Sequence, residues 1–391
     1  MQQTSWLKIW VAFLAGCIAA FQIGKTFAAL ALIIQELDLS LVQAGLILSL
    51  FSLISAFAGA GFGLLSDRLG HLRTVLAGLV VSACGTFLGA TAVDVELLMM
   101  SRLLEGFGFI LAIVALPSLI GGSSSDRDRP LAMGLWGAFM PAGIGMSMLI
   151  TPLLLEWHGW RGLWNDIGLV MLFWGSVLFI TFRNTPRKPR SDVSTADVIA
   201  NVLRPGPLLV VAGFVCYSSL YQSLTAFLPT MLVTDYAVPL AKAASLGALV
   251  VVGNIIGNLS AGWLIGRGVV PWKLLATSFV VMAVCAMLVF ASVTDPVVKI
   301  IAGFLFSAFG GLYPGTAFAL AARFSLSPSH MAMMAGFMLQ GAGIGQTIGP
   351  MMVSSIVEFS GSWNFAIVIV LLMATIGLGC ALFLRRQSVT P

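Results

Sequence analysis

Residues 7–34 read LKIWVAFLAGCIAAFQIGKTFAALALII and contain only two charged side chains, Lys8 and Lys25. A helix needs about 20 mainly apolar residues to cross the hydrocarbon core of a bilayer. The stretch is too long for the apolar core of a cleavable secretion signal, and no small-residue cleavage site follows it. It therefore predicts a transmembrane helix near the N-terminus.

The composition extends this prediction to the whole chain of 391 residues. Hydrophobic residues make up 59% of it and charged residues only 9%, whereas about a quarter of an ordinary soluble domain is charged. The mean hydropathy is +1.02. Lipid must therefore surround most of the chain, and the lipid bilayer is its first expected partner. The net charge of +5 does not indicate nucleic-acid binding, because the basic residues lie in short loops between apolar runs.

Twelve apolar runs are long enough to span a membrane, and their boundaries are approximate. They predict an all-α membrane protein with twelve transmembrane helices in two six-helix pseudo-symmetric bundles. The expected spans are 7–34, 42–65, 74–93, 97–120, 131–155, 162–182, 206–232, 243–266, 272–292, 297–321, 331–356 and 363–384.

The positions of the 20 Lys and Arg residues predict the orientation. An even number of spans puts both termini on one side of the membrane. Only Arg161, Lys242 and Lys299 then fall on the opposite side, and Lys25 and Arg102 lie within spans. Basic residues concentrate on the cytoplasmic side of inner-membrane proteins. We therefore expect a multi-pass protein of a bacterial inner membrane with both termini in the cytoplasm.

A polar segment at the middle of the chain separates two halves. The expected division is an N-terminal six-helix bundle at 1–182, a cytoplasmic linker at 183–205 and a C-terminal six-helix bundle at 206–391. The linker is basic and interrupted by proline in its first part. Near 192–203 it could form a short amphipathic helix on the inner leaflet.

The two halves also share sequence. Ala142-Gly143-Ile144-Gly145 recurs as residues 342–345, and Trp160 before the sixth span is matched by Trp363 before the twelfth. Gly63 with Arg68 is echoed by Gly262 with Arg267. Duplicated bundles of this kind are common in transporters, which bind their substrate near the midplane between the halves.

Two motifs carry a resemblance to a known family. Residues 63–73 read GLLSDRLGHLR, and residues 102–108 read RLLEGFG. Together with the span count and the repeat, they resemble the signature loop and the fourth-helix motif of the major facilitator superfamily, although His71 and Leu72 replace a usual basic pair. The resemblance covers essentially the whole chain and implies alternating access. The signature loop also assigns a gating role to Asp67, Arg68 and Arg73 in this sequence.

Within that superfamily the chain is most similar to the cyanate permease and nitroimidazole transporter branch. The residues concerned are Gly24-Lys25, the SLVQAGL stretch at 40–46 and the GLWGAFMP stretch at 134–141. Nitrate porters resemble one another in arginines on the second and eighth spans, and both spans lack an interior arginine here.

Four charged residues lie within or near the apolar spans: Lys25, Arg102, Glu105 and Asp166. A charge at the bilayer centre costs about 2.5 kcal/mol or more, so it must be paired, hydrated or functional. Lys25, which shares a helix face with Gln22, is predicted to contact an anionic substrate. The alternative roles for Lys25 are snorkelling outward to the membrane surface or pairing with an acid such as Asp166.

Arg102 and Glu105 lie one turn apart on one face. They form either a structural ion pair or a site where Arg102 binds substrate and Glu105 takes up a proton. Asp166 is a further candidate for proton coupling, although an interfacial or salt-bridging role is favoured for it.

The second half offers uncharged donors instead. They are expected to complete a substrate site for a small, partly apolar anion, with interhelical hydrogen bonding as the alternative role for each. The candidates are Tyr217, Tyr221, Gln222, Tyr313 and Gln340.

These observations predict a secondary active transporter, proton-coupled or facilitative, for a small organic or inorganic anion. The alternative is a proton-coupled multidrug efflux antiporter, which favours an acidic residue in the first span. A membrane sensor would require an appended soluble domain. Enzyme chemistry is not expected, since His71, His158 and His330 lie at loops or span ends. No metal, cofactor or nucleic acid is expected to bind, and the chain is expected to act as a monomer.

Overall fold

The computed structural model of the chain describes residues 3–125, 127–184, 200–201, 203–324 and 328–387, and these ranges are helical with no strand. The N-terminal half holds α1 (Trp6–Glu36), α2 (Leu41–Leu69), α3 (His71–Ala90), α4 (Val95–Ser123), α5 (Arg129–Gly137) and α6 (Phe139–Phe182). The C-terminal half holds α8 (Pro205–Thr234), α9 (Leu240–Gly266), α10 (Pro271–Phe290), α11 (Pro296–Gly310), α12 (Leu312–Phe324), α13 (Pro328–Ser360), the short 3-10 helix η1 (Trp363–Phe365) and α14 (Ala366–Gln387).

Helix lengths in the described residues account for twelve membrane crossings. Ten helical stretches are long and apolar enough to span a bilayer. One of them, α6, has 44 residues, which at about 1.5 Å per residue is twice the thickness of the hydrocarbon core. The 33 residues of α13 supply a further crossing. The predicted fold class is therefore confirmed.

The long helix α6 reverses direction at Gly159, where φ is 64° and ψ is −176°. Its first half runs alongside α1 in the same direction, since Gly143 packs against Cys17 and, further along both helices, the Ser147 hydroxyl donates a hydrogen bond to the Phe21 carbonyl. Its second half returns, because the Trp174 indole N–H donates a bond of 3.0 Å to the carbonyl of Val11, near the start of α1. The predicted sixth span corresponds to the second half of α6. The predicted fifth span, 131–155, is divided at Ala138 between the short helix α5 and the first half of α6.

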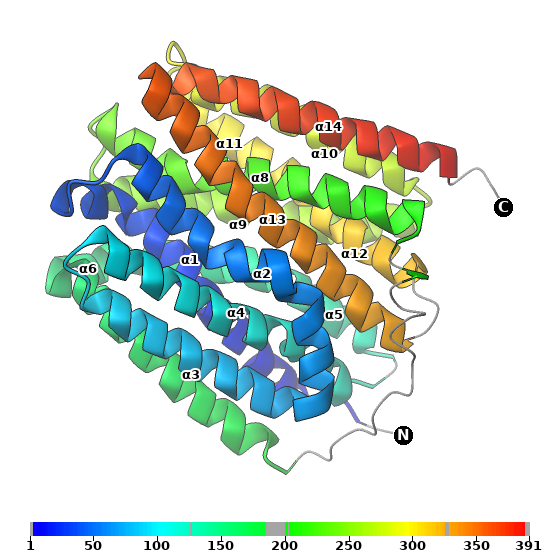
Figure 1. Cartoon of the computed structure of the whole chain (residues 1–391). Coiled ribbons are helices and arrows are strands. Elements are labelled where there is room, and N and C mark those ends of the chain that lie inside the picture. Colours follow the sequence, from blue (N-terminus) through cyan, green and yellow to red (C-terminus); the bar gives the residue numbers. More distant parts are fainter. Residues whose placement is uncertain (1–2, 126, 185–199, 202, 325–327, 388–391) are drawn as a thin grey trace.

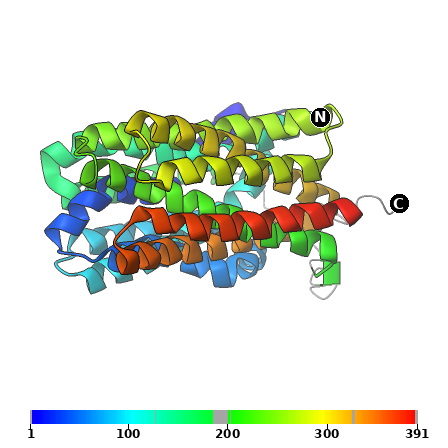
Figure 2. The ribbon, with the colours of Figure 1, turned by 90° about the horizontal axis from the view of Figure 1, so that it is seen from above.

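The helices form two bundles that meet along their length (Figure 1). In the first, α1 packs on α6 and α3 packs on α4; in the second, α10 packs on α11 and α14. The two bundles touch mainly through α2 with α13 and α6 with α9. Seen from above, the long helices run nearly along the long axis of the bundle (Figure 2). Both termini lie at the same end of the bundle (Figure 1).

The backbone repeats the duplication seen in the sequence. Positive φ occurs in the described residues at three pairs of positions that correspond between the halves, which are Asp38 with Ala237, Gly70 with Gly268, and Gly159 with Gly361. The glycine pairs occupy tight turns that other residues enter at a steric cost. Gly70 ends α2 inside the signature loop, and Gly268 follows α9 at the equivalent turn. The turns, as well as the helices, are therefore duplicated.

Small residues let α2 and α13 approach closely between the bundles. A Cβ added at Gly45 would lie 2.1 Å from Ser354 Oγ, and one added at Gly343 would lie 2.3 Å from Ser55 Oγ. Between these points the Ser52 hydroxyl donates a hydrogen bond of 2.9 Å to Gln346 Oε1. Small residues of this kind are typical of helix packing in membranes.

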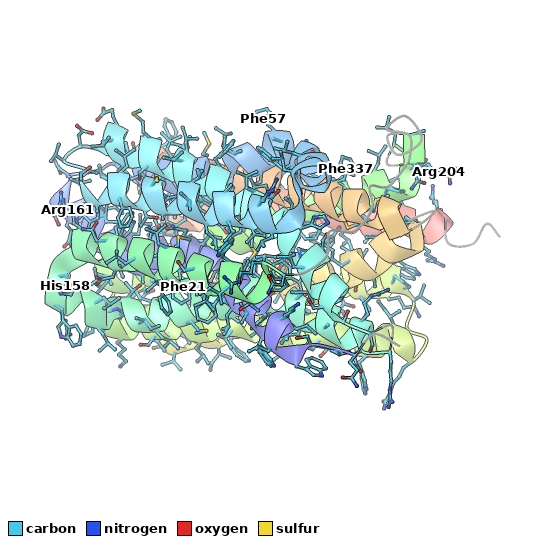
Figure 3. The ribbon with its side chains drawn as sticks, turned by 90° about the horizontal axis from the view of Figure 1, so that it is seen from below. Phe21, Phe57, His158, Arg161, Arg204 and Phe337 are labelled. Carbon is cyan, nitrogen blue, oxygen red and sulfur yellow. The ribbon has the colours of Figure 1, made fainter. Side chains whose placement is uncertain are left out.

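The bundles also meet at the end opposite the termini, called the far end below. Figure 3 shows His158 and Arg161 at the far end and Arg204 at the other. At the far end the Glu358 carboxylate of α13 accepts a hydrogen bond of 2.6 Å from the backbone N–H of Val42, in the first turn of α2. A carboxylate at a helix N-terminus is stabilised by the helix dipole, so this contact favours a closed far end.

Glu358→Gln is expected to shift the molecule toward conformations with an open far end by about two- to five-fold, because a charge at a helix N-terminus contributes about 0.3–1 kcal/mol. The measurement is the distance distribution between spin labels at Gln35→Cys and Phe359→Cys, with the native cysteines replaced. Glu156→Gln, an exposed glutamate of α6, serves as the control. An unchanged distribution in Glu358→Gln would show that the contact does not favour closure.

Candidate functional site

Lys25, Arg102 and Glu105 form one buried cluster inside the N-terminal bundle. The Lys25 ammonium on α1 lies 2.8 Å from Glu105 Oε1 on α4, and the Arg102 guanidinium is paired with the other oxygen, Oε2. Lys25 and Glu105 are 0% exposed and Arg102 is 1% exposed. The Glu105 carboxylate therefore bridges the two cations away from lipid and water.

Carbonyl groups and aromatic rings complete the surroundings of the two cations. The Arg102 guanidinium donates hydrogen bonds to the carbonyl oxygens of Gln22 on α1, at 3.0 Å, and Ile47 on α2, at 3.3 Å. Its central carbon lies 4.6 Å from the centre of the Phe51 ring, and Lys25 Nζ lies 4.2 Å from the Trp164 ring on α6. Aromatic faces attract cations, more strongly where water is excluded.

Two glycines allow the helices around Glu105 to approach closely. A Cβ at Gly85 of α3 would lie 2.7 Å from the Glu105 backbone nitrogen, and one at Gly106 of α4 would lie 1.9 Å from the Phe51 carbonyl oxygen. These contacts press α4 against α2 and α3. They hold the cluster at the crossing of these helices with α1.

Gln22 of α1, beside the charged cluster, connects the cluster to α3 and α6. The Gln22 amide nitrogen donates to the hydroxyls of Ser82 and Thr86 and to the sulfur of Met171. Gln22 Oε1 and the indole N–H of Trp164 are buried without a hydrogen-bond partner among the described residues. Buried polar atoms are nearly always paired, so these two atoms are available to a ligand or to water.

The charges of the cluster do not balance. Arginine stays protonated in proteins, so an ammonium at Lys25 and a carboxylate at Glu105 leave one excess positive charge. Excess charge in a low-dielectric site is costly unless a counter-ion neutralises it. The arrangement therefore suits one additional negative charge.

The structure places Asp166 apart from this cluster. Its carboxylate lies 3.2 Å from His158 Nδ1, and both side chains are partly exposed at the far end. This position fits the interfacial, salt-bridging role that was favoured for Asp166. Lys25 does not snorkel outward, since its side chain is fully buried. It pairs with an acid, as one of its alternative roles required, but the acid is Glu105 of α4 and not Asp166.

The predicted tyrosines gather in the C-terminal bundle. The rings of Tyr217 and Tyr313 are stacked with centres 5.3 Å apart, and Tyr221 stacks on the other side of Tyr217 at 5.7 Å. The Tyr313 hydroxyl donates to the Val210 carbonyl, and the Tyr217 hydroxyl accepts from the Asn254 amide. Tyr217 and Tyr313 are thus held within their own bundle. Tyr221 is half-buried, and its hydroxyl donates a long hydrogen bond of 3.5 Å to the Val251 carbonyl of α9.

The remaining predicted site and gating residues lie on α8, on α13 and around the turn between α2 and α3. Gln222 of α8 is buried, and Gln340 of α13 is half-buried beside Gly59 of α2. Arg73, in the first turn of α3, is exposed. The side chains of Asp67 and Arg68 lie outside the described part of the structure, as does most of the predicted linker.

Lys299 has a structural role that the sequence did not indicate. It was expected on the side opposite the termini. It lies in the first turn of α11, is 1% exposed, and donates hydrogen bonds to the carbonyls of Val289 and Ala291. These carbonyls belong to the C-terminal end of α10, where cations are stabilised. Among the described residues, no group of three or more His, Cys, Asp or Glu side chains could hold a metal ion.

Comparison with known proteins agrees with this architecture. The family model described as Major Facilitator Superfamily matches residues 12–339. The chain belongs to the major facilitator superfamily. It is therefore a multi-pass membrane transporter of small molecules, and the prediction that it is not an enzyme is confirmed by the family.

The chain is similar to two curated proteins and, in fold, to a solved structure. A Haemophilus influenzae protein named as a metabolite transport protein is 26% identical over 375 residues, which cover 91% of this chain and 89% of that protein. The Escherichia coli cyanate transport protein CynX is 27% identical over 200 residues, 50% of each chain. A crystal structure of a bacterial homolog of the human lysosomal transporter Spinster, inward-facing and occupied, has a TM-score of 0.80 at 16% identity and covers 97% of this chain and 96% of that one.

Proposed function

We propose that this superfamily transporter carries a small organic or inorganic anion across a bacterial inner membrane by alternating access, with coupling to protons. The supporting observation is the buried cluster of Lys25, Arg102 and Glu105. With Lys25 protonated it carries one excess positive charge, which suits one more anionic group. The unpaired indole N–H of Trp164 adds a hydrogen-bond donor beside the Lys25 ammonium.

The C-terminal half completes the substrate site, and the chain has a fixed orientation in the membrane. Tyr221, Gln222 and Gln340 face the substrate from α8 and α13, and the halves divide at the linker 183–205. The signature-loop residues Asp67, Arg68 and Arg73 gate the end that carries both termini, which lies in the cytoplasm. The resemblance to the cyanate permease branch, supported by similarity to CynX over half of the chain, makes cyanate a first candidate. The transporter acts as a monomer.

Lys25→Met is expected to lower anion uptake about ten-fold or more, because a hydrogen bond to a charged group contributes about 1.5–3 kcal/mol. The measurement is uptake of radiolabelled cyanate, formate, lactate and nitrate into proteoliposomes, with and without a pH gradient. The variant is expected to fold, because the Arg102–Glu105 pair that remains is neutral overall. Lys242→Met, an exposed lysine in the first turn of α9, is the control.

Two outcomes would count against the proposal. Unchanged uptake by Lys25→Met would remove Lys25 from the substrate site. Transport of cationic dyes with no uptake of any anion by the wild-type protein would support a multidrug efflux antiporter instead.

A further inference from the structure

The three buried charges also constrain how a proton accompanies the substrate. The ionisable groups beside the Lys25 ammonium are Glu105 and Arg102, both on α4. From the other helices, the described contacts of the cluster come from uncharged groups, which include Phe51 on α2, Ser82 on α3 and Trp164 on α6. The total charge of the site is therefore set by three side chains.

The net charge of the cluster depends on which of its groups carry a proton. Arg102 contributes one positive charge throughout. With Glu105 ionised, the site is neutral when Lys25 is an amine and carries one positive charge when Lys25 is an ammonium. Protonation of Glu105 beside the Lys25 ammonium would leave two positive charges and break both ion pairs. Protonation of Glu105 beside a Lys25 amine also gives one positive charge, but an amine is a stronger base than a carboxylate, so a single added proton lies on Lys25. A buried site favours the neutral total.

We infer that Lys25, rather than Glu105, binds the proton that travels with the substrate, and that the substrate is a monoanion carried without net charge. This inference rests on the proposed function. The empty site is neutral, with Lys25 as an amine. When a monoanion enters, Lys25 takes one proton from the same side of the membrane, and the loaded site is neutral again. On the other side the anion and the proton leave together.

The inference also limits the substrate class. A dianion would leave one uncompensated negative charge beside Glu105, even with Lys25 protonated. Discrimination against dianions therefore follows from the same charge count. Because the loaded site holds one more proton than the empty site, affinity for a monoanion rises as the pH falls, by up to about ten-fold for each pH unit.

The test is the number of protons taken up per anion bound, from titration calorimetry of the purified protein in two buffers with different ionisation enthalpies. The probe is whichever of cyanate, formate, lactate and nitrate gives the highest uptake, with succinate as the dianion. We expect one proton per monoanion, uptake into proteoliposomes that is independent of membrane potential, and at least ten-fold weaker binding of succinate. Binding of a monoanion without proton uptake would overturn the inference while leaving the proposed function intact. Failure of every anion to bind would overturn the proposed function itself.

Lys25→Arg separates the two possible proton carriers. A guanidinium keeps its charge, so this variant is expected to bind the monoanion with no proton uptake and little pH dependence. One proton per anion in Lys25→Arg would assign the proton to Glu105 and overturn the inference. Infrared difference spectra of the wild-type protein make the same distinction without any variant. Protonation of Glu105 on anion binding would add a carboxylic acid carbonyl band, and protonation of Lys25 would not.

Discussion

Replacement of Glu105 by glutamine is expected to destabilise the protein by about 3–5 kcal/mol, because removing one partner of a buried ion pair leaves an uncompensated charge. Glu105 contacts both basic side chains of the cluster, Lys25 on α1 and Arg102 on its own helix. Lys25 can be an uncharged amine, as inferred for the empty site, and is protonated only at low pH, whereas Arg102 keeps its charge and has no counter-ion in the variant. We therefore expect the loss of stability to be largest at low pH and to persist at high pH.

Unfolding in mixed micelles with increasing SDS, followed by tryptophan fluorescence, measures this loss. Glu96→Gln is the matched control, because Glu96 lies in the first turn of the same helix and is exposed. Surface substitutions of this kind usually change stability by less than about 0.5 kcal/mol. Equal effects of the two substitutions would show that the buried ion pairs do not stabilise the fold.

A double variant tests whether the loss of stability in Glu105→Gln arises from cations left without a partner. Lys25→Met in the Glu105→Gln background removes one of them and is expected to restore about 0.5–3 kcal/mol, the usual range of coupling between contacting residues. Additive losses from the two substitutions would mean that Lys25 and Glu105 do not interact in the folded protein.

The membrane fold was predictable because the length of an apolar run is fixed by the thickness of the bilayer. The predicted first span, 7–34, corresponds to α1 at Trp6–Glu36. The reversal between the fifth and sixth spans was also predicted, although helical geometry continues up to the single turn at Gly159. The tenth span, predicted as continuous over 297–321, is divided at Gly311 between α11 and α12. Local backbone geometry of this kind is not encoded in hydropathy.

The residues of the charged cluster were predictable one by one, but their arrangement was not. The cost of a charge in lipid singled out Lys25, Arg102 and Glu105, and helical spacing put the last two on one face. The contact between Lys25 and Glu105 joins residues far apart in sequence on two helices, and its partner had been sought in Asp166. Helix rotation and tilt in a bundle are set by packing of small residues, so the acid that meets Lys25 depends on tertiary structure.

Gly106→Ala is expected to destabilise the protein by about 1–3 kcal/mol or more, the usual cost of forcing an extra carbon into a packed core. The added Cβ would lie 1.9 Å from the Phe51 carbonyl oxygen, and backbone atoms cannot move aside as a flexible side chain can. The separation of α4 from α2 that follows would draw the Phe51 ring away from the Arg102 guanidinium. Anion uptake is therefore expected to fall together with stability.

Gly121→Ala makes the same chemical change on the same helix at a place where nothing lies within 4 Å of the added carbon. Alanine favours the helix over glycine by about 1 kcal/mol, so this variant is expected to be as stable as the wild-type protein or slightly more stable. The measurement is the SDS unfolding curve and the uptake rate of each variant. Since alanine favours the helix at both positions, a loss of stability in Gly106→Ala alone reports the close approach of α2 and α4. Equal stability of the two variants would mean that α4 tolerates separation from α2 and that Gly106 does not hold the charged cluster in place.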